Sequence, residues 1–207
     1  MKPSYWIAFG GLLVANLVTI VSFLIGWVTF GEILWSYWCQ SVLIGISNAI
    51  RMSLLSDFST EGFTSNDKPV PENAEGKRST VLFFLGHYGF FHAVYLFFLI
   101  GLTSDETTFF GTGTILIVVL TLFFLGSELL VLREQMRIDA LGKPNIGSMM
   151  MLPYLRIIPM HLTILFGGVS AAGSVIFLGL KLLADLLGHY VDERINLSAL
   201  QKAGKSQ

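Results

Sequence analysis

Long apolar blocks, separated by polar stretches, dominate the chain. Six segments each hold about 20 mostly apolar residues, the length that a helix needs to cross a hydrocarbon core of ~30 Å. They are residues 6–28, 33–54, 80–102, 109–132, 147–166 and 171–191. These blocks are about twice as long as the strands of a transmembrane barrel and do not alternate. The pattern therefore predicts an all-α membrane protein, a bundle of six transmembrane helices.

Polar stretches define the rest of the expected organisation. Residues 56–79 are rich in Pro, Gly and Ser, and residues 195–207 are also polar. Segments of this composition bury too little apolar surface to order themselves. We therefore predict one transmembrane domain over residues 1–194, with a mobile loop at 56–79 and a flexible tail at 195–207.

Basic residues indicate the orientation of the bundle. With the N-terminus on one side, all 13 Lys and Arg residues except Arg156 and Lys181 fall on or near that side. The opposite side has Glu32, Asp105 and Glu106 and no basic residue. The positive-inside rule assigns the basic side to the cytoplasm. We expect a multi-pass protein of the cell membrane with both termini and both long loops in the cytoplasm.

Composition agrees with a bilayer environment and argues against other classes. Hydrophobic residues make up 53% of the 207 residues and charged residues 13%, about half the charged fraction of a soluble domain. The net charge of −1 argues against a nucleic-acid partner. Cys39 is the single cysteine, so neither an intrachain disulfide nor a cysteine-based zinc module is available.

Ionisable groups inside the predicted helices are the candidates for function, because charge within a bilayer is costly. All four histidines lie in or at the edge of these helices. A rise of about 1.5 Å per residue places the polar groups at two levels in the cytoplasmic half. The outer level holds Asn48, His87, Glu128, Asp185 and His189, with Arg156 close to it. The inner level holds His92, His161 and Lys181.

The last predicted helix carries a polar stripe. Lys181, Asp185 and His189 are spaced by four and share one face of an otherwise apolar helix. Asp185 and His189 can ligate one metal ion, or the carboxylate can orient the imidazole. Alternatively, the three side chains only neutralise one another.

Arg156 stands between Pro153 and Pro159 in the fifth segment. Prolines loosen the backbone hydrogen bonding of a membrane helix, and such breaks often line a cavity. A carboxylate at this depth needs a partner or takes up a proton. We expect Arg156 to form an ion pair with Asp185 or Glu128.

Four stretches carry a family resemblance: WSYWCQSVLIGISN at 35–48, GHYGFF at 86–91, RIIPMHLTILFGG at 156–168 and LKLLADLLGH at 180–189. They resemble an uncharacterised family of small polytopic membrane proteins of bacteria and archaea, a domain of unknown function. The resemblance implies the helical fold over most of the chain. The family usually has a glutamate after its W-x-Y-W motif, where this chain has Gln40.

A metal site is the leading functional hypothesis. It would use His87, Asp185 and His189, with His161 or Glu128 as a further ligand. Imidazole and carboxylate suit zinc, iron or manganese. An open coordination position would activate water for hydrolysis, and a redox role is also consistent. Haem, held by two of the histidines, is a less natural variant.

Two other classes remain open. The same polar residues could form the path of a proton- or ion-coupled transporter or channel subunit. Six spans without an internal repeat would then favour a homodimer. In a structural or assembly subunit without a ligand, the polar groups would only join the helices. The sequence does not decide whether the protein is an enzyme.

Overall fold

The computed structural model describes residues 3–104, 112–165 and 171–205. Helices form nearly all of it, which confirms the all-α class. The helices are α1 (Pro3–Leu24), α2 (Phe30–Ser53), α3 (Ala74–Thr103), α4 (Thr112–Asp139), α5 (Ile146–Met151), the 3-10 helix η1 (Leu152–Arg156), α6 (Ile157–Leu165) and α7 (Ala171–Lys205). A short hairpin of β1 (Thr64–Ser65) and β2 (Lys68–Pro69) precedes α3.

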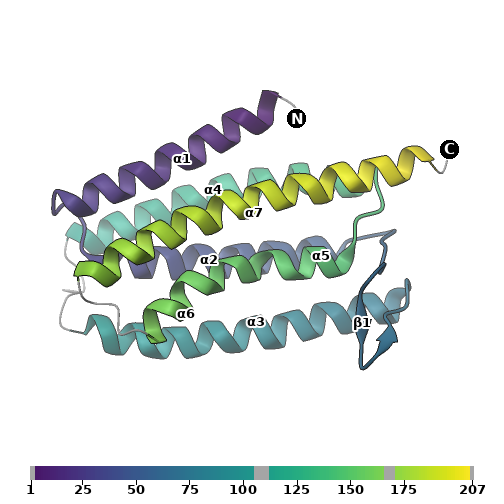
Figure 1. Cartoon of the computed structure of the whole chain (residues 1–207), viewed down its shortest axis with the longest axis horizontal. Helices are drawn as coiled ribbons and strands as arrows, with labels where there is room; N and C mark the ends of the chain where they lie inside the picture. The colour runs from purple at the N-terminus through teal and green to yellow at the C-terminus, as the bar shows by residue number, and fades with distance from the viewer. Residues whose placement is uncertain (1–2, 105–111, 166–170, 206–207) are drawn as a thin grey trace.

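The long helices run side by side with alternating direction (Figure 1). Helix α2 contacts α3, α4, α5 and η1, and α7 contacts α1, α4, η1 and α6. The α5–η1–α6 segment lies beside α3, and the start of α1 and the end of α7 both point toward the side of the bundle that carries the hairpin (Figure 1). This arrangement brings the polar residues of α2, η1 and α7 together inside the bundle.

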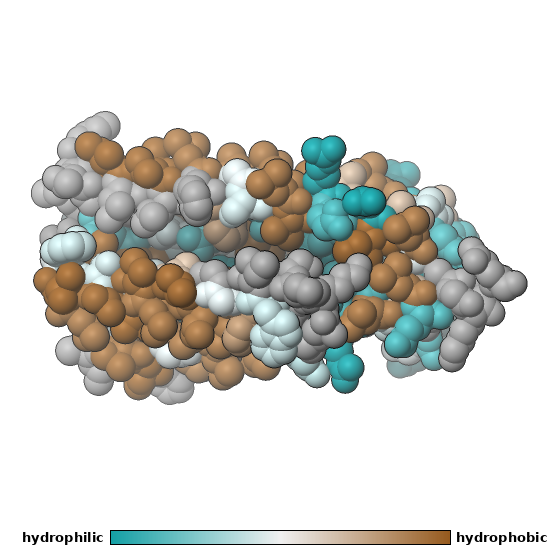
Figure 2. Space-filling view, turned by 90° about the horizontal axis from the view of Figure 1, so that it is seen from above, coloured by the Kyte–Doolittle hydropathy of each residue, from teal (hydrophilic) through white to brown (hydrophobic). Residues whose placement is uncertain are grey.

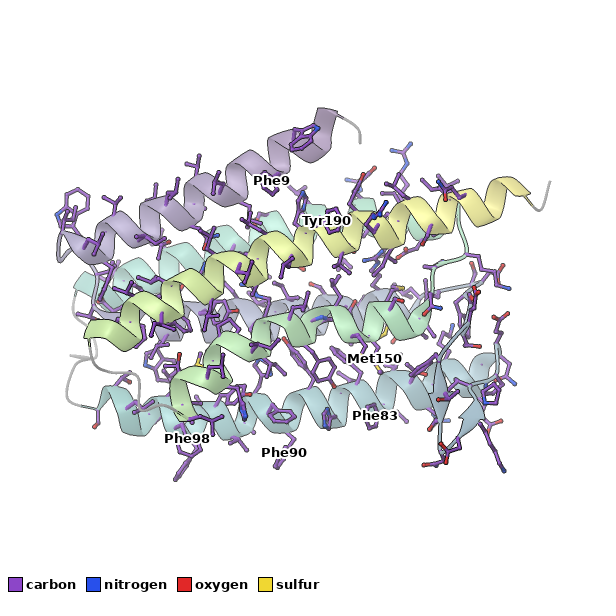
Figure 3. All side chains as sticks on the ribbon, in the orientation of Figure 1. Phe9, Phe83, Phe90, Phe98, Met150 and Tyr190 are labelled. Carbon is purple, nitrogen blue, oxygen red and sulfur yellow. The ribbon has the colours of Figure 1, made fainter. Side chains whose placement is uncertain are left out.

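Three segments of the described residues are long and apolar enough to cross a membrane: Ala74–Thr103, Ile146–Leu165 and Gly173–Gln201. The apolar helix at Leu12–Leu24 is shorter. Large apolar side chains are widely exposed, such as Phe97 at 77% and Leu130 at 70%. Phe90 and Phe98 of α3 point away from the other helices (Figure 3). These findings support a multi-pass membrane protein, but three qualifying segments do not establish the predicted six.

Several of the observed helices are longer than the predicted segments. Helix α3 begins at Ala74 instead of 80, α4 continues to Asp139 instead of 132, and α7 continues to Lys205 instead of 191. The predicted limits at 109 and 166 lie outside the described residues. Hydropathy detects only the apolar part of a helix, whereas caps decide where the helix ends. The Asn73 side chain, for example, accepts a hydrogen bond from the Gly76 amide at 2.9 Å.

The described part of the predicted flexible tail, residues 195–205, is the end of α7. Ile195, Asn196 and Ala199 are buried there, and the Ala199 carbonyl accepts a hydrogen bond from the Lys143 amide. More hydrophilic residues gather at this end of the molecule than at the opposite end (Figure 2). The polar composition of residues 195–205 thus reflects a helix that extends beyond the apolar layer, not a segment without contacts.

The loop at 56–79, which was predicted to be mobile, is attached to the bundle. Phe58 belongs to the main hydrophobic core. The Ser59 amide donates to the Pro144 carbonyl at 2.8 Å, and the Ser59 carbonyl accepts from the Ile146 amide at 3.0 Å. The Thr60 amide and the Lys143 ammonium also hold the pKa of the Glu72 carboxyl below its usual range.

The fifth predicted segment is broken, as its prolines indicated. Pro153 has no N–H, so it cannot donate to the Met149 carbonyl four residues earlier. The Leu152 amide and the Asn48 side chain of α2, the latter at 3.0 Å, donate to that carbonyl. The Tyr37 hydroxyl, also from α2, donates to the Arg156 carbonyl at 3.0 Å. Helix α2 therefore supplies hydrogen bonds that keep the break stable away from water.

Gly45 sets the close approach of α2 to α3. A Cβ atom at this position would overlap the ring of Tyr88, whose hydroxyl is fixed by a 2.9 Å hydrogen bond to the Ser41 carbonyl. We expect Gly45→Ala to lower the free energy of unfolding by about 1–3 kcal/mol. Gly89→Ala on α3 meets open space and is the matched control. Equal melting temperatures of the two variants in detergent would contradict this packing argument.

Candidate functional site

Four side chains from three elements form a buried group that we call the central charge cluster: Asn16 of α1, Arg156 of η1, and Lys181 and Asp185 of α7. Arg156 Nη1 donates to Asp185 Oδ1. Lys181 Nζ donates to Asp185 Oδ2 at 3.0 Å and to Asn16 Oδ1 at 2.7 Å. Asn16 Nδ2 completes the ring by donating to Asp185 Oδ2 at 3.1 Å. The predicted Arg156–Asp185 ion pair is confirmed.

Helix α2 covers the cationic side of the cluster. The Arg156 guanidinium lies 5.0 Å and the Lys181 ammonium 5.7 Å from the centre of the Tyr37 ring, within cation–π range. Arg156 Nη2 reaches Gln40 Oε1 only at 3.4 Å. The buried Nε of Arg156 has no hydrogen-bond partner among the described residues. Arg156 is therefore the least satisfied member of the cluster.

The charges in the cluster do not cancel. Two cations, Arg156 and Lys181, share the single carboxylate of Asp185, and the side chains of all three are at most 12% exposed. Glu128 of α4 lies within electrostatic reach of Arg156, but it is hydrogen-bonded to Ser47 of α2. Buried charge is tolerated in proteins when it is paired. Within the central charge cluster itself, two cations therefore share one carboxylate.

A second polar chain joins α2 to α3 beside Arg156. His92 Nδ1 lies 2.9 Å from the Tyr88 carbonyl, so this nitrogen carries a proton and donates. His92 Nε2 lies 3.0 Å from the Ser41 hydroxyl, which in turn lies 2.9 Å from the Tyr88 hydroxyl. His92 and Ser41 also line a narrow space with Arg156, which is too small to hold a water molecule in this conformation.

The remaining histidines have separate partners. His87 Nδ1 lies 2.9 Å from the Tyr154 hydroxyl, and its ring stacks on Phe83. His161 Nδ1 lies 3.2 Å from the Tyr95 hydroxyl. The ring of His189 lies 6.3 Å from that of Phe9 of α1. His92 and His161, which were predicted at the same inner level, are linked through Tyr95, whose ring contacts both imidazoles.

The predicted metal ligands do not assemble. In residues 3–104, 112–165 and 171–205, no three His, Cys, Asp or Glu side chains form a group that could hold a metal ion. Asp185 is occupied by Arg156, Lys181 and Asn16. The physical reason is that equal depth along neighbouring helices does not fix their rotation, so side chains at one level can face different partners.

An ion-pair network that the sequence did not indicate joins the ends of α2, α4 and α7. Arg51 donates from Nε and Nη2 to Asp139, from Nη1 to Asp192 at 2.8 Å, and from Nη2 to Asn196 at 2.9 Å. Gln135 Nε2 donates to Asp192 at 2.6 Å. We call these five residues the helix-end clamp. Gln135, Asp139, Asp192 and Asn196 were missed because they lie beyond the predicted helices 109–132 and 171–191.

Asn16 was also missed. It is the one strongly polar side chain in the apolar part of the first segment. That isolated position could have indicated a buried polar contact from the sequence alone. Its side chain is 3% exposed and reaches the last helix of the chain.

Comparison with known proteins yields one match. A model of a family of unknown function (DUF6498) matches residues 2–202, nearly the whole chain. No curated protein and no solved structure matches the sequence or the fold. The comparison therefore supports the expected resemblance to an uncharacterised family and gives no activity.

Proposed function

The chain belongs to the DUF6498 family of unknown function, and on that premise we propose that it is a membrane transporter or channel subunit that binds a small anion at Arg156. The observation that carries this proposal is the state of the Arg156 guanidinium. It sits in a cluster with excess positive charge, and its Nε–H has no acceptor among the described residues. An arginine fork of this kind favours carboxylate-like anions.

The broken helix supports transport in particular. Arg156 is the last residue of η1, between two short helical pieces that pack on α2, α3 and α7. Transporters commonly bind substrate near the bilayer midplane at discontinuous helices. Polar side chains of Tyr95, Ser41 and His92 line the narrow space beside Arg156. Because that space is closed here, an anion would enter when α6 moves relative to α2.

For the membrane topology we propose six spans: α1, α2, α3, α4, the α5–η1–α6 segment and α7. The alternating helix directions support this proposal, as do the exposed apolar side chains of α1 and α4 (Figure 1). Basic residues on the side of the termini support a cytoplasmic location of both ends in the cell membrane. A homodimer would supply the two halves that alternating access requires.

Flux measurements on the purified chain in liposomes test the proposal. Chloride, nitrate, formate, acetate and phosphate gradients are applied one at a time, while the internal pH and the membrane potential are recorded. We expect at least one anion to drive flux in the unmodified protein. Arg156→Gln should lower that flux roughly ten- to hundred-fold, since a hydrogen bond to a charged group is lost. Lys181 and Asp185 would remain as a neutral pair, which favours folding.

Arg137→Gln is the matched control, because Arg137 is 76% exposed on α4 and forms only a 3.8 Å surface pair. It should leave the flux unchanged. The absence of flux with all five anions, or an equal flux in Arg156→Gln, would refute the proposal. Elemental analysis of the same preparation tests the metal-binding prediction, and about one zinc, iron or manganese ion per chain would favour that alternative.

A further inference from the structure

Glu128 is a carboxylate within electrostatic reach of both ionic networks of the bundle. It belongs to α4, which packs against α2 and α7, and it is half-buried. The charged groups near it are Arg156 of the central charge cluster and Asp192 of the helix-end clamp, and α2 presents the Ser47 hydroxyl. Its neighbours one turn away on α4, at positions 124, 125, 131 and 132, are apolar. An ionisable side chain in such a place on a membrane helix is a candidate for function.

Glu128 differs from Asp185 in how firmly its charge is held. Asp185 accepts hydrogen bonds from the other three members of the central charge cluster, so it is held as a carboxylate. Within the part of the chain that the structure describes, Glu128 forms no salt bridge, and its hydrogen-bond partner is Ser47. A hydroxyl can donate to a carboxylate or accept from a carboxylic acid. The surroundings of Glu128 therefore suit both of its protonation states.

Glu128 also completes the charge balance of the bundle interior. The two cations of the cluster exceed its one carboxylate by a single charge, which an ionised Glu128 compensates. A monovalent anion at Arg156 would then leave one negative charge without compensation, with Asp192 as a further negative charge nearby. Because charge inside a bilayer is costly, binding of the anion favours protonation of Glu128.

We propose that Glu128 carries the proton in a proton–anion symport, in which each monovalent anion at Arg156 moves together with one proton. This inference rests on the proposed anion transport. The proton comes from water on the side where the anion enters and forms an O–H bond at the Glu128 carboxylate. That bond breaks on the other side, where the proton and the anion both return to water.

Charge balance explains why the two movements would be coupled. The empty site with ionised Glu128 is neutral, and so is the site that holds both the anion and the proton. A site with only one of them carries a net charge, which makes the change of access across the membrane costly. The full cycle therefore moves no net charge.

Proton uptake during anion flux tests the proposal. Liposomes with the full chain receive an inward gradient of chloride, nitrate, formate, acetate or phosphate, with equal pH on both sides. Potassium and valinomycin set the membrane potential. We expect the interior to acidify as the anion enters, with one proton for each monovalent anion, and the flux to be independent of the potential. Protein-free liposomes correct for the passive entry of formic and acetic acid.

Glu128→Gln preserves the shape of the side chain and removes the proton site. This variant should lose the acidification, and its remaining anion flux should depend on the membrane potential. Glu134→Gln is the matched control, because Glu134 is on the same helix, is 63% exposed and forms only a surface pair. It should acidify the interior as the unmodified protein does.

The outcomes separate this inference from the proposed function. Anion flux without proton uptake in the unmodified protein overturns the symport alone, as does unchanged acidification in Glu128→Gln. The absence of flux with every anion refutes the anion transport and the symport together. Since the first result comes from the unmodified protein, the test remains decisive even if Glu128→Gln does not fold.

Discussion

Arg51→Met is expected to lower the free energy of unfolding by about 3–5 kcal/mol. The guanidinium is 2% exposed and is the only cation of the helix-end clamp. Its removal leaves the carboxylates of Asp139 and Asp192 facing each other without a counter-charge, at 5% and 17% exposure. Unfolding in a denaturing detergent titration measures the loss. Arg51→Lys should be intermediate, because an ammonium cannot reproduce the two parallel bonds to Asp139.

Arg137→Met provides the control for this prediction. The residue type and the replacement are the same, but the Arg137–Glu134 pair is on the surface and is worth at most about 1 kcal/mol. If Arg51→Met were as stable as Arg137→Met, the clamp would contribute nothing to stability.

Asp185→Asn is expected to lower the free energy of unfolding by a similar amount, about 3–5 kcal/mol, because it removes a buried negative charge. Asparagine preserves the shape of the side chain, so packing is conserved. Two buried cations, Arg156 and Lys181, lose their shared carboxylate. Unfolding of the purified variant in the same detergent titration gives the magnitude.

A double substitution separates charge from other effects. Adding Lys181→Met to Asp185→Asn removes one of the two unpaired cations, so the double variant should regain about 0.5–3 kcal/mol relative to additive behaviour. Asp57→Asn is the control, since Asp57 is 67% exposed and lies 3.5 Å from Lys143. Strictly additive effects of the two substitutions would argue against a shared cluster.

The sequence predicted those features that depend on a single helix. The spacing of Lys181 and Asp185 placed both on one face of α7, and they are hydrogen-bonded there. The prolines predicted the break around Arg156, and its depth limited the expected ion-pair partner to Asp185 or Glu128, of which Asp185 is the observed one. Each of these inferences uses the rise or the period of one helix, which the chain itself determines.

Features that depend on how helices are rotated against one another were not predictable in the same way. His87 and Asp185 have similar estimated depths, yet His87 pairs with Tyr154 and Asp185 with Arg156. Asn48 was expected among the polar side chains of the outer level, and its partner there is the Met149 carbonyl of the fifth segment. Depth gives a level in the bundle, whereas the partner at that level depends on packing.

The central charge cluster also imposes an order on biosynthesis. Asn16 bonds to Asp185 and Lys181, which follow it by 169 and 165 residues. At 5–20 residues per second, a ribosome needs roughly ten to thirty seconds to make that stretch. The first helix is therefore synthesised long before its partners, and it carries only the neutral amide of Asn16. The charged residues Lys181 and Asp185 are synthesised last, and they are already paired four residues apart on α7. Assembly of the protein ends with the joining of its first and last helices.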